Sequence, residues 1–108
     1  MTAIAAVYLK TLTSKSIGLL GAKKAYPVFF KTRWGIHTYF LQFSIDVLIL
    51  DSGNIVIKAV KDLPPYSIVV WHPRYENVLE LPAGEIKKND FKLGDRIEIT
   101  YTNLPHKR

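Results

Sequence analysis

Short β-prone segments separated by closely spaced turn residues dominate this sequence, and they restrict its fold more than any other feature. The clearest segment is the apolar run 47–50, which lies between Asp46 and Asp51 and is predicted to be a strand buried on both faces. A turn at 51–54 leads into a second strand-forming segment at 54–60, so the two segments are predicted to form a hairpin. No long helical pattern lies between the predicted strands, which argues against a parallel sheet built from strand–helix–strand units.

The remaining segments predict further strands and one short helix. The stretch 82–91 is the best helix candidate, because Pro82 suits a first helical turn and two lysines favour its C-terminal end. A separate helical turn is expected after Thr13 or Ser14, either of which can cap it. The other predicted strands cover 3–9, 25–32, 36–43, 66–71, 77–82 and 94–102.

The composition fits one folded domain and excludes several kinds of site. A chain of 108 residues with 48% hydrophobic and 22% charged residues is typical of a single globular domain, predicted here over 1–103 with a flexible tail at 104–108. The strand pattern predicts a mainly β, antiparallel sandwich or barrel with one short α-helix. The absence of cysteine excludes disulfides, thiolate zinc sites and cysteine nucleophiles.

The sequence also predicts the cellular location of the protein. No apolar run approaches the roughly 18 residues of a transmembrane helix, and the N-terminus lacks the positive region and cleavage site of a secretory signal. We therefore expect a cytoplasmic protein with no membrane partner. The lack of cysteine, the single methionine and the abundant lysine are typical of thermophile proteins.

The net charge of +6 is concentrated in the first part of the chain. Residues 1–45 hold six basic and no acidic residues, whereas nine basic and nine acidic residues cancel in 46–108. Such a region can be the surface of a protein that binds a polyanion such as nucleic acid, but it is more often a solvated face that acids elsewhere in the fold balance. The candidate polyanion-binding residues are Lys23, Lys24, Lys31, Arg33 and Trp34.

Two segments place aromatic side chains beside basic ones: KTRWG at 31–35 and WHPRY at 71–75. Aromatic rings next to arginine are typical of a surface that stacks bases or sugars. In a small β domain, however, aromatic residues more often form the core. The sequence leaves both interpretations open.

Three polar residues, His37, Thr38 and Asp46, interrupt segments that otherwise favour burial. The histidines show no metal-ligand spacing, so no metal or cofactor is predicted. A buried carboxylate is costly unless it is paired or hydrogen-bonded, and Arg33 is the candidate partner for Asp46 because a guanidinium can hold a carboxylate by two parallel bonds. The interpretations of Asp46 are therefore a structural ion pair, a cap of exposed amides at a strand end, or a ligand-facing group.

Glu80 lies inside the segment 77–82, where strict alternation puts its side chain on the face opposite Leu79 and Leu81. If Glu80 came near Asp46, the two carboxylates would form an acid/base couple with separated pKa values. The short motifs of phosphate loops, dinucleotide sites, zinc proteases and serine hydrolases do not occur in the sequence. We therefore favour a non-catalytic module over an enzyme.

Several separated motifs resemble one known family. They are GIHT, IDV and LD within 35–51, VLELPAG at 78–84 and GD at 94–95. In this order they are similar to the uncharacterised family called domain of unknown function 192, over roughly residues 25–100. The resemblance implies a jelly-roll-like β-sandwich with one short helix, a tight strand-to-helix entry at Gly84, and no particular activity.

Together the residues and the resemblance predict a non-catalytic module that binds a small ligand or a protein. The binding site is expected at a polar patch where strand ends meet, and nucleic acid is the alternative partner. The candidate ligand-binding residues are Arg33, His37, Thr38, Asp46 and Glu80.

Overall fold

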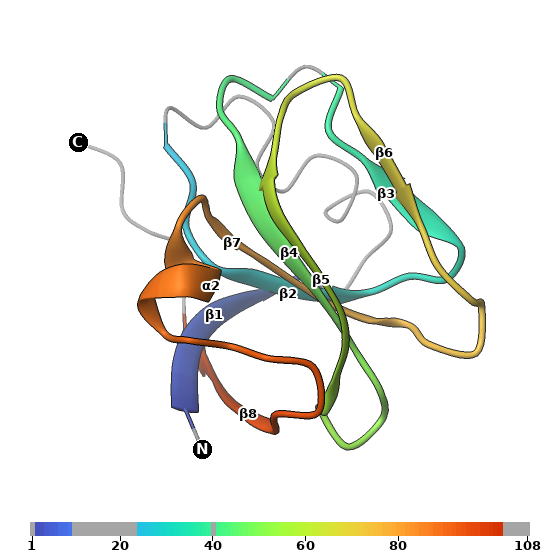
Figure 1. Ribbon diagram of the computed structural model, residues 1–108, viewed down its shortest axis with the longest axis vertical. Coiled ribbons are helices and arrows are strands. Elements are labelled where there is room, and N and C mark those ends of the chain that lie inside the picture. The colour runs from blue at the N-terminus through green and yellow to red at the C-terminus, as the bar shows by residue number, and fades with distance from the viewer. Residues whose placement is uncertain (1, 10–23, 40, 103–108) are drawn as a thin grey trace.

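In the computed structural model, which describes residues 2–9, 24–39 and 41–102, the chain forms two β-sheets and one short helix (Figure 1). The larger sheet has six strands in the order β5-β4-β7-β2-β1-β8, and the smaller sheet is a ribbon that pairs β3 with β6. The mainly β class with one short helix is therefore confirmed. The elements are β1 (Thr2–Leu9), β2 (Val28–Lys31), β3 (Gly35–His37), β4 (Ile45–Leu50), β5 (Val56–Leu63), β6 (Ile68–Val70), β7 (Asn77–Pro82), α2 (Glu85–Lys88) and β8 (Ile97–Thr102).

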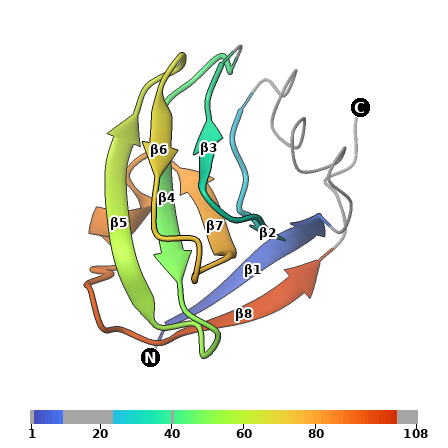
Figure 2. The same cartoon turned by 90° about the vertical axis from the view of Figure 1, so that its right-hand side faces the viewer.

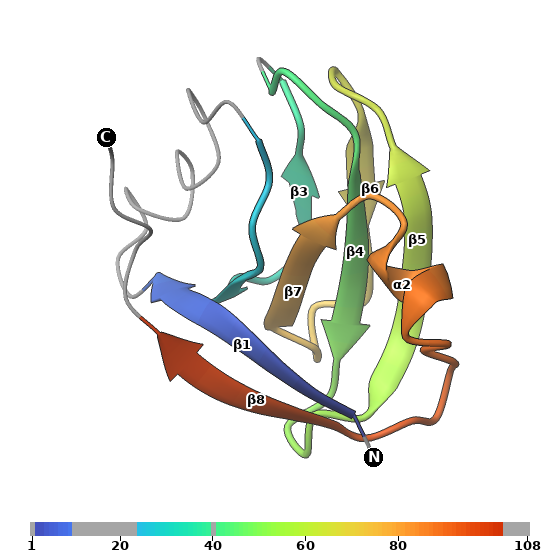
Figure 3. The ribbon, with the colours of Figure 1, turned by 90° about the vertical axis from the view of Figure 1, so that its left-hand side faces the viewer.

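Two apolar clusters cover the two faces of the larger sheet. Figure 2 shows the β3–β6 ribbon on one side of this sheet, and Figure 3 shows α2 on the other. The inner cluster, between the sheet and the ribbon, contains Val7, Leu9, Val28, Phe30, Ile45, Val47, Ile49, Leu63, Val69, Trp71 and Val78. The outer cluster, on the side of α2, contains Ala6, Phe29, Leu48, Leu50, Val56, Leu79, Leu81, Ile86, Phe91 and Ile97.

Strand β4 contributes to both clusters. All six of its residues are buried, and successive side chains point to opposite faces of the sheet. Val47 and Ile49 belong to the inner cluster, whereas Leu48 and Leu50 belong to the outer one. The prediction of a strand buried on both faces is confirmed.

The predicted hairpin after this strand is also present, because β4 pairs with β5 in antiparallel register. Its turn is closed by the side chain of Asp51, whose Oδ1 accepts hydrogen bonds from the backbone N–H groups of Gly53 (2.8 Å) and Ile55 (2.9 Å). The register shifts between Ile45 and Val47, so two residues of β5, 61 and 62, lie opposite Asp46, one more than in regular pairing.

The expectation of a purely antiparallel sheet is wrong for β1. This strand pairs in parallel with β2 on one side and with β8 on the other. Parallel strands need a crossover of a dozen or more residues, usually a helix but not necessarily one. Residues 10–27 separate β1 from β2, and most of the domain separates β1 from β8, so both connections are long enough without a long helix.

The helix is shorter than predicted. Only Glu85–Lys88 form a helical turn within the predicted stretch 82–91. Gly84 precedes it with φ 95°, a left-handed conformation that costs glycine little, so the tight entry at this position is confirmed. Beyond the helix, Asp90 also takes a left-handed conformation (φ 54°), which ends the helical path.

The larger sheet stays open at its edges. In the described residues, an isolated bridge between Ile55 and Arg96 and backbone hydrogen bonds between 54–56 and 94–97 link the two edges, but no continuous strand pairing closes a barrel. The jelly-roll-like sandwich stays a prediction. The helical turn after Thr13 or Ser14 and the tail 104–108 lie outside the described residues. No helix in the described part is long and apolar enough to cross a membrane.

Candidate functional site

The carboxylate of Asp46 is buried and fully engaged with backbone amides. Its side chain is on β4, and the residue is 1% exposed. Oδ1 accepts a hydrogen bond from the N–H of Asp62 (2.9 Å), and Oδ2 accepts from the N–H groups of Gly84 (3.0 Å) and Ile86 (2.9 Å). Three charge-assisted bonds compensate for the burial of a carboxylate. Asp46 therefore joins the bulged part of β5 to the start of α2, as one of its sequence interpretations predicted.

The expected pairing of Arg33 with Asp46 is wrong. Arg33 lies in the turn between β2 and β3, where its Nη1 donates to the carbonyl oxygen of Pro73 (2.6 Å). Its Nη2 lies 3.5 Å from Oε1 of Glu76, and both side chains of this pair are well exposed. Backbone N–H groups, and not the Arg33 guanidinium, are the partners of Asp46. Every residue except proline has such a group, so the sequence does not show which ones bind a carboxylate.

Thr38 is also a structural residue. It is completely buried at the end of β3, and its Oγ1 donates to the carbonyl oxygen of Pro64 (2.7 Å) and accepts from the N–H of Ser67 (2.9 Å). Its hydroxyl thereby holds the turn before β6 against the end of β3. With these partners the hydroxyl is occupied as both donor and acceptor.

His37 points to the outside of the ribbon. The residue is exposed, its Nδ1 accepts a hydrogen bond from the N–H of Tyr39 (3.3 Å), and its ring lies 5.0 Å from that of Tyr39. The Tyr39 ring in turn lies 6.0 Å from the ring of Tyr66. His37 is thus part of a row of surface rings and is not grouped with the carboxylates.

Glu80 lies on β7 within the inner face of the larger sheet. In the sheet register its neighbours are Val28 on β2 and Val47 on β4. Asp46 is the residue before Val47, so the side chains of Asp46 and Glu80 point to opposite faces and form no acid/base couple. Burial raises the pKa of Glu80 from 4.5 to about 8, because charge is unfavourable among apolar side chains.

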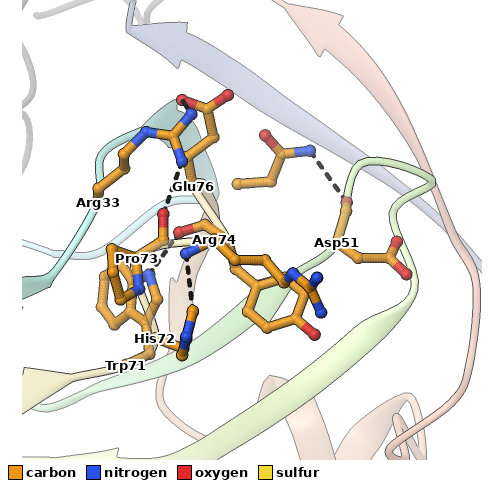
Figure 4. A network of polar contacts seen from close by, with 9 residues as sticks. Arg33, Asp51, Trp71, His72, Pro73, Arg74 and Glu76 are labelled. Carbon is orange, nitrogen blue, oxygen red and sulfur yellow. Dashed lines mark hydrogen bonds and ion pairs between the residues drawn. The ribbon is translucent and has the colours of Figure 1, made fainter.

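The two segments with mixed aromatic and basic residues come together in space. The N–H of Trp71 donates to the carbonyl oxygen of Trp34 (3.0 Å), and the N–H of Thr32 donates to that of Glu76 (2.8 Å). Figure 4 shows Arg33 held over Pro73 and beside Glu76, with His72 and Arg74 on the same loop. We call this region the basic–aromatic surface; it consists of Lys31, Arg33, Trp34, His72 and Arg74.

Sequence analysis predicted only part of this surface. Lys31, Arg33 and Trp34 were candidates and are all exposed, whereas His72 and Arg74 were not among them. His72 and Arg74 lie in the WHPRY segment, whose composition suggested a binding surface. That this segment lies next to KTRWG depends on strand pairing between distant parts of the chain, which the sequence pattern does not show. Lys24 is exposed shortly before β2, and Lys23 lies outside the described residues. In the part of the chain that the structure describes, no group of three or more carboxylates and histidines could hold a metal ion.

Comparison with known proteins places the chain in a family. The model of the DUF192 family, described as "Uncharacterized ACR", matches residues 3–99. A relative, UPF0127 protein PYRAB11210 of Pyrococcus abyssi, is 38% identical in an alignment of 71 residues that covers 64% of this chain. The match covers 60% of that relative, less than two thirds of its length.

Two solved structures share the fold. One is a protein of unknown function from Novosphingobium aromaticivorans, with a TM-score of 0.73 and 15% identity, covering 82% of this chain and 70% of the other. The second, from Sinorhizobium meliloti, is described as a proposed transcription regulator, with a TM-score of 0.72 and 20% identity over 82% of this chain and 76% of the other. On the family match and the shared motifs, this chain belongs to the uncharacterised DUF192 family.

Proposed function

We propose that this domain is a non-catalytic binding module that takes single-stranded nucleic acid on its basic–aromatic surface. The observation that carries the proposal is Trp34, which is 68% exposed and has a φ of 81°. A left-handed conformation in a bulky residue costs on the order of 1–3 kcal/mol. Packing of the indole offsets little of this cost, because most of the residue is exposed to solvent. Strain that displays a large ring is typical of recognition sites.

The chemistry around Trp34 suits a nucleic acid strand. An exposed indole can stack on any base, and lysine and arginine side chains contact phosphates. Lys31, Arg33 and Arg74 supply the cations, and Glu76 pairs with Arg33. The net charge of the chain, +6, favours the approach of a polyanion.

The bonding of the other candidates supports a non-catalytic module. Asp46 holds three amides and Thr38 holds two backbone groups, so neither is available to act on a substrate. His37 is exposed on the ribbon, and Glu80 is buried behind it. The bonds of Asp46 and Thr38 favour structural roles for these residues, so we place the binding surface elsewhere.

Replacing Trp34 tests this proposal. Trp34→Gly should weaken binding of a fluorescein-labelled, mixed-sequence single-stranded RNA by about ten-fold or more, because base stacking contributes about 1–3 kcal/mol. It should leave the stability of the fold unchanged or higher, because glycine accepts this φ without strain. The measurements are fluorescence anisotropy at low salt and urea unfolding.

Leu93→Ala is the matched control. Leu93 is 67% exposed, in the loop after α2, so this variant removes a comparable apolar side chain away from the surface. Its affinity for the RNA should equal that of the wild type. If the wild type does not bind the RNA even at low salt, or if both variants lose affinity equally, the proposal is wrong.

Arg74→Ala should change the salt dependence of binding. For single strands, the logarithm of affinity falls with the logarithm of salt concentration by about 0.7 per neutralised phosphate. Removing one phosphate contact should therefore make the slope shallower by about 0.7. Lys87→Ala, which removes an exposed cation from α2, should leave the slope unchanged. If both variants changed the salt dependence equally, the effect would come from the overall charge of the protein and not from a phosphate contact at Arg74, which would contradict the proposal.

A further inference from the structure

Strand β8 forms an edge of the larger sheet, and most of its outer backbone groups have no partner among the described residues. It pairs in regular parallel register with β1 over six residues, and Figures 2 and 3 show it as the outermost strand on that side of the sheet. Within the described part of β8, the N–H of Ile97 alone bonds on the far side, to the carbonyl oxygen of Asn54 (2.9 Å). An open, regular edge is a template for a further strand.

The alternation of the backbone identifies which groups of β8 are open. The N–H and C=O groups of successive residues in a strand point to opposite sides of the strand. Ile97 directs its N–H away from β1 and towards Asn54. Ile99 and Tyr101 therefore also direct their N–H and C=O groups away from β1, whereas residues 98 and 100 face it.

The opposite edge of the sheet, β5, is protected in ways that β8 is not. Two register shifts interrupt β5, Lys58 and Lys61 are exposed on it, and its first residue, Val56, hydrogen-bonds to 94–95. Bulges, lysines and covering segments protect edge strands from pairing with another chain. In contrast, β8 alternates isoleucine, threonine and tyrosine, which favour strands, and carries one charge, at Glu98. This contrast favours a role in pairing for β8.

The outer face beside this edge carries exposed apolar side chains. Tyr101 is 53% exposed, and Tyr8 on β1 is 36% exposed, with the centroids of the two rings 5.2 Å apart. Ile99 is half-buried and packs against the outer cluster. A further strand at β8 would place its own side chains beside Ile99 and Tyr101 and remove part of this apolar surface from water.

The sequence of β8 is complementary to itself. Residues that lie opposite each other in an antiparallel pair share one face of the sheet. If two β8 strands pair around Thr100, Ile99 of each copy lies opposite Tyr101 of the other, and Glu98 lies opposite Thr102. Apolar side chains then meet apolar side chains, and no like charges are opposed. The open N–H and C=O groups of Ile99 and Tyr101 also bond to each other in this register.

Two neighbouring registers are less favourable. Pairing around Ile99 would need the N–H of Ile97, which already donates to Asn54. Pairing around Glu98 would place the carboxylates of the two copies opposite each other, which is destabilising. The register around Thr100 avoids both conflicts and uses only residues 98–102.

We propose that two copies of this chain form a symmetric dimer through antiparallel pairing of β8 around Thr100, which joins their larger sheets into one. The partner of this edge is thus a second copy of the chain. The contact lies on β8, outside the basic–aromatic surface, so the dimer goes beyond nucleic acid binding and does not depend on it.

Charge changes on β8 test both the dimer and its register. Sedimentation equilibrium of the wild type should show a dimer fraction that rises with protein concentration up to about 0.5 mM, the range of weak association. Thr100→Glu should raise the dissociation constant of the dimer about ten-fold, because it opposes two carboxylates beside Glu98. Thr102→Lys should lower this constant about two-fold or more, because it places an ammonium group opposite Glu98 of the other copy.

Ser52→Glu is the matched control for Thr100→Glu. Ser52 is exposed in the turn between β4 and β5, so this variant adds the same charge away from β8. Its dissociation constant should equal that of the wild type.

A measurement on the wild type keeps the proposal testable if Thr100→Glu fails to fold. In this register Thr100 forms a non-hydrogen-bonded pair with its copy, which brings their α protons together. A mixture of isotope-labelled and unlabelled copies should therefore give an intermolecular NOE between the Thr100 α protons.

Three results would overturn the proposal: a protein that stays monomeric up to about 0.5 mM, a dimer that Thr102→Lys weakens as much as Thr100→Glu, or a dimer without the Thr100 NOE. RNA binding by the basic–aromatic surface is measured separately with the Trp34 and Arg74 variants, so the failure of one proposal leaves the other standing.

Discussion

Asp46→Asn should destabilise the domain by about 3–5 kcal/mol, although the side chain keeps its shape. The carboxylate of Asp46 accepts hydrogen bonds from the backbone N–H groups of Asp62, Gly84 and Ile86. An asparagine side chain has one oxygen and one NH₂ group, so at least one buried amide would face a donor. Urea unfolding should show a much lower midpoint with an unchanged slope.

Asp90→Asn is the matched control for this change. Asp90 is exposed, pairs with Lys92 and has a φ of 54°, a conformation that asparagine tolerates. Its effect should stay within about 0.5 kcal/mol. If Asp46→Asn were as stable as the wild type and lost only a binding activity, Asp46 would be a ligand-facing group after all.

Glu80 should make the domain less stable as pH rises. Burial raises its pKa in the folded state to about 8, against 4.5 for the ordinary side chain. Between these two values the folded state holds the proton and the unfolded state has lost it, so the free energy of unfolding falls with increasing pH. The contribution is fully present below about pH 4.5, and a loss on the order of 5 kcal/mol is complete above about pH 8.

Glu80→Gln should remove this pH dependence. Glutamine resembles the protonated acid, so the variant and the wild type should have similar stability at about pH 5, and the variant should be the more stable one at about pH 9. Unfolding in urea across this pH range measures the difference. Glu98→Gln is the exposed control and should parallel the wild type. Parallel curves for Glu80→Gln and the wild type would show that Glu80 titrates normally.

Local pattern was sufficient to predict much of the fold. The apolar run at 47–50 and the turn at 51–54 correctly predicted a buried strand and its hairpin partner. The family resemblance, and not local pattern alone, predicted the tight entry to the helix at Gly84, which is present. These features depend on alternation, turn chemistry and backbone freedom, all of which act between residues close in sequence.

The partners of the polar residues could not be predicted in the same way. Asp46 binds amides up to 40 residues away, and backbone amides look alike in every sequence. The parallel pairing of β1 depends on connections whose path the residue pattern does not show. Likewise, KTRWG and WHPRY had the right composition for a surface, but only the strand pairing brings them together.

The two carboxylates illustrate why position on a strand decides a role. Asp46 and Glu80 lie on neighbouring strands, yet their side chains point to opposite faces of the larger sheet. One face offers three amide donors, and the other offers valines and aromatic rings. The face of the sheet to which each side chain points therefore makes Asp46 a structural carboxylate and leaves Glu80 as a buried carboxyl group among apolar side chains.

The location of the nucleic acid site is the central claim, and amide chemical-shift mapping tests it most directly. Addition of a mixed-sequence single-stranded RNA at low salt should perturb the amides and indole groups of 31–35 and 70–76. Amides of β8 and α2 should not shift, and the changes should reverse as salt is added. Shifts centred on β8 or α2, or no shifts at low salt, would contradict the account.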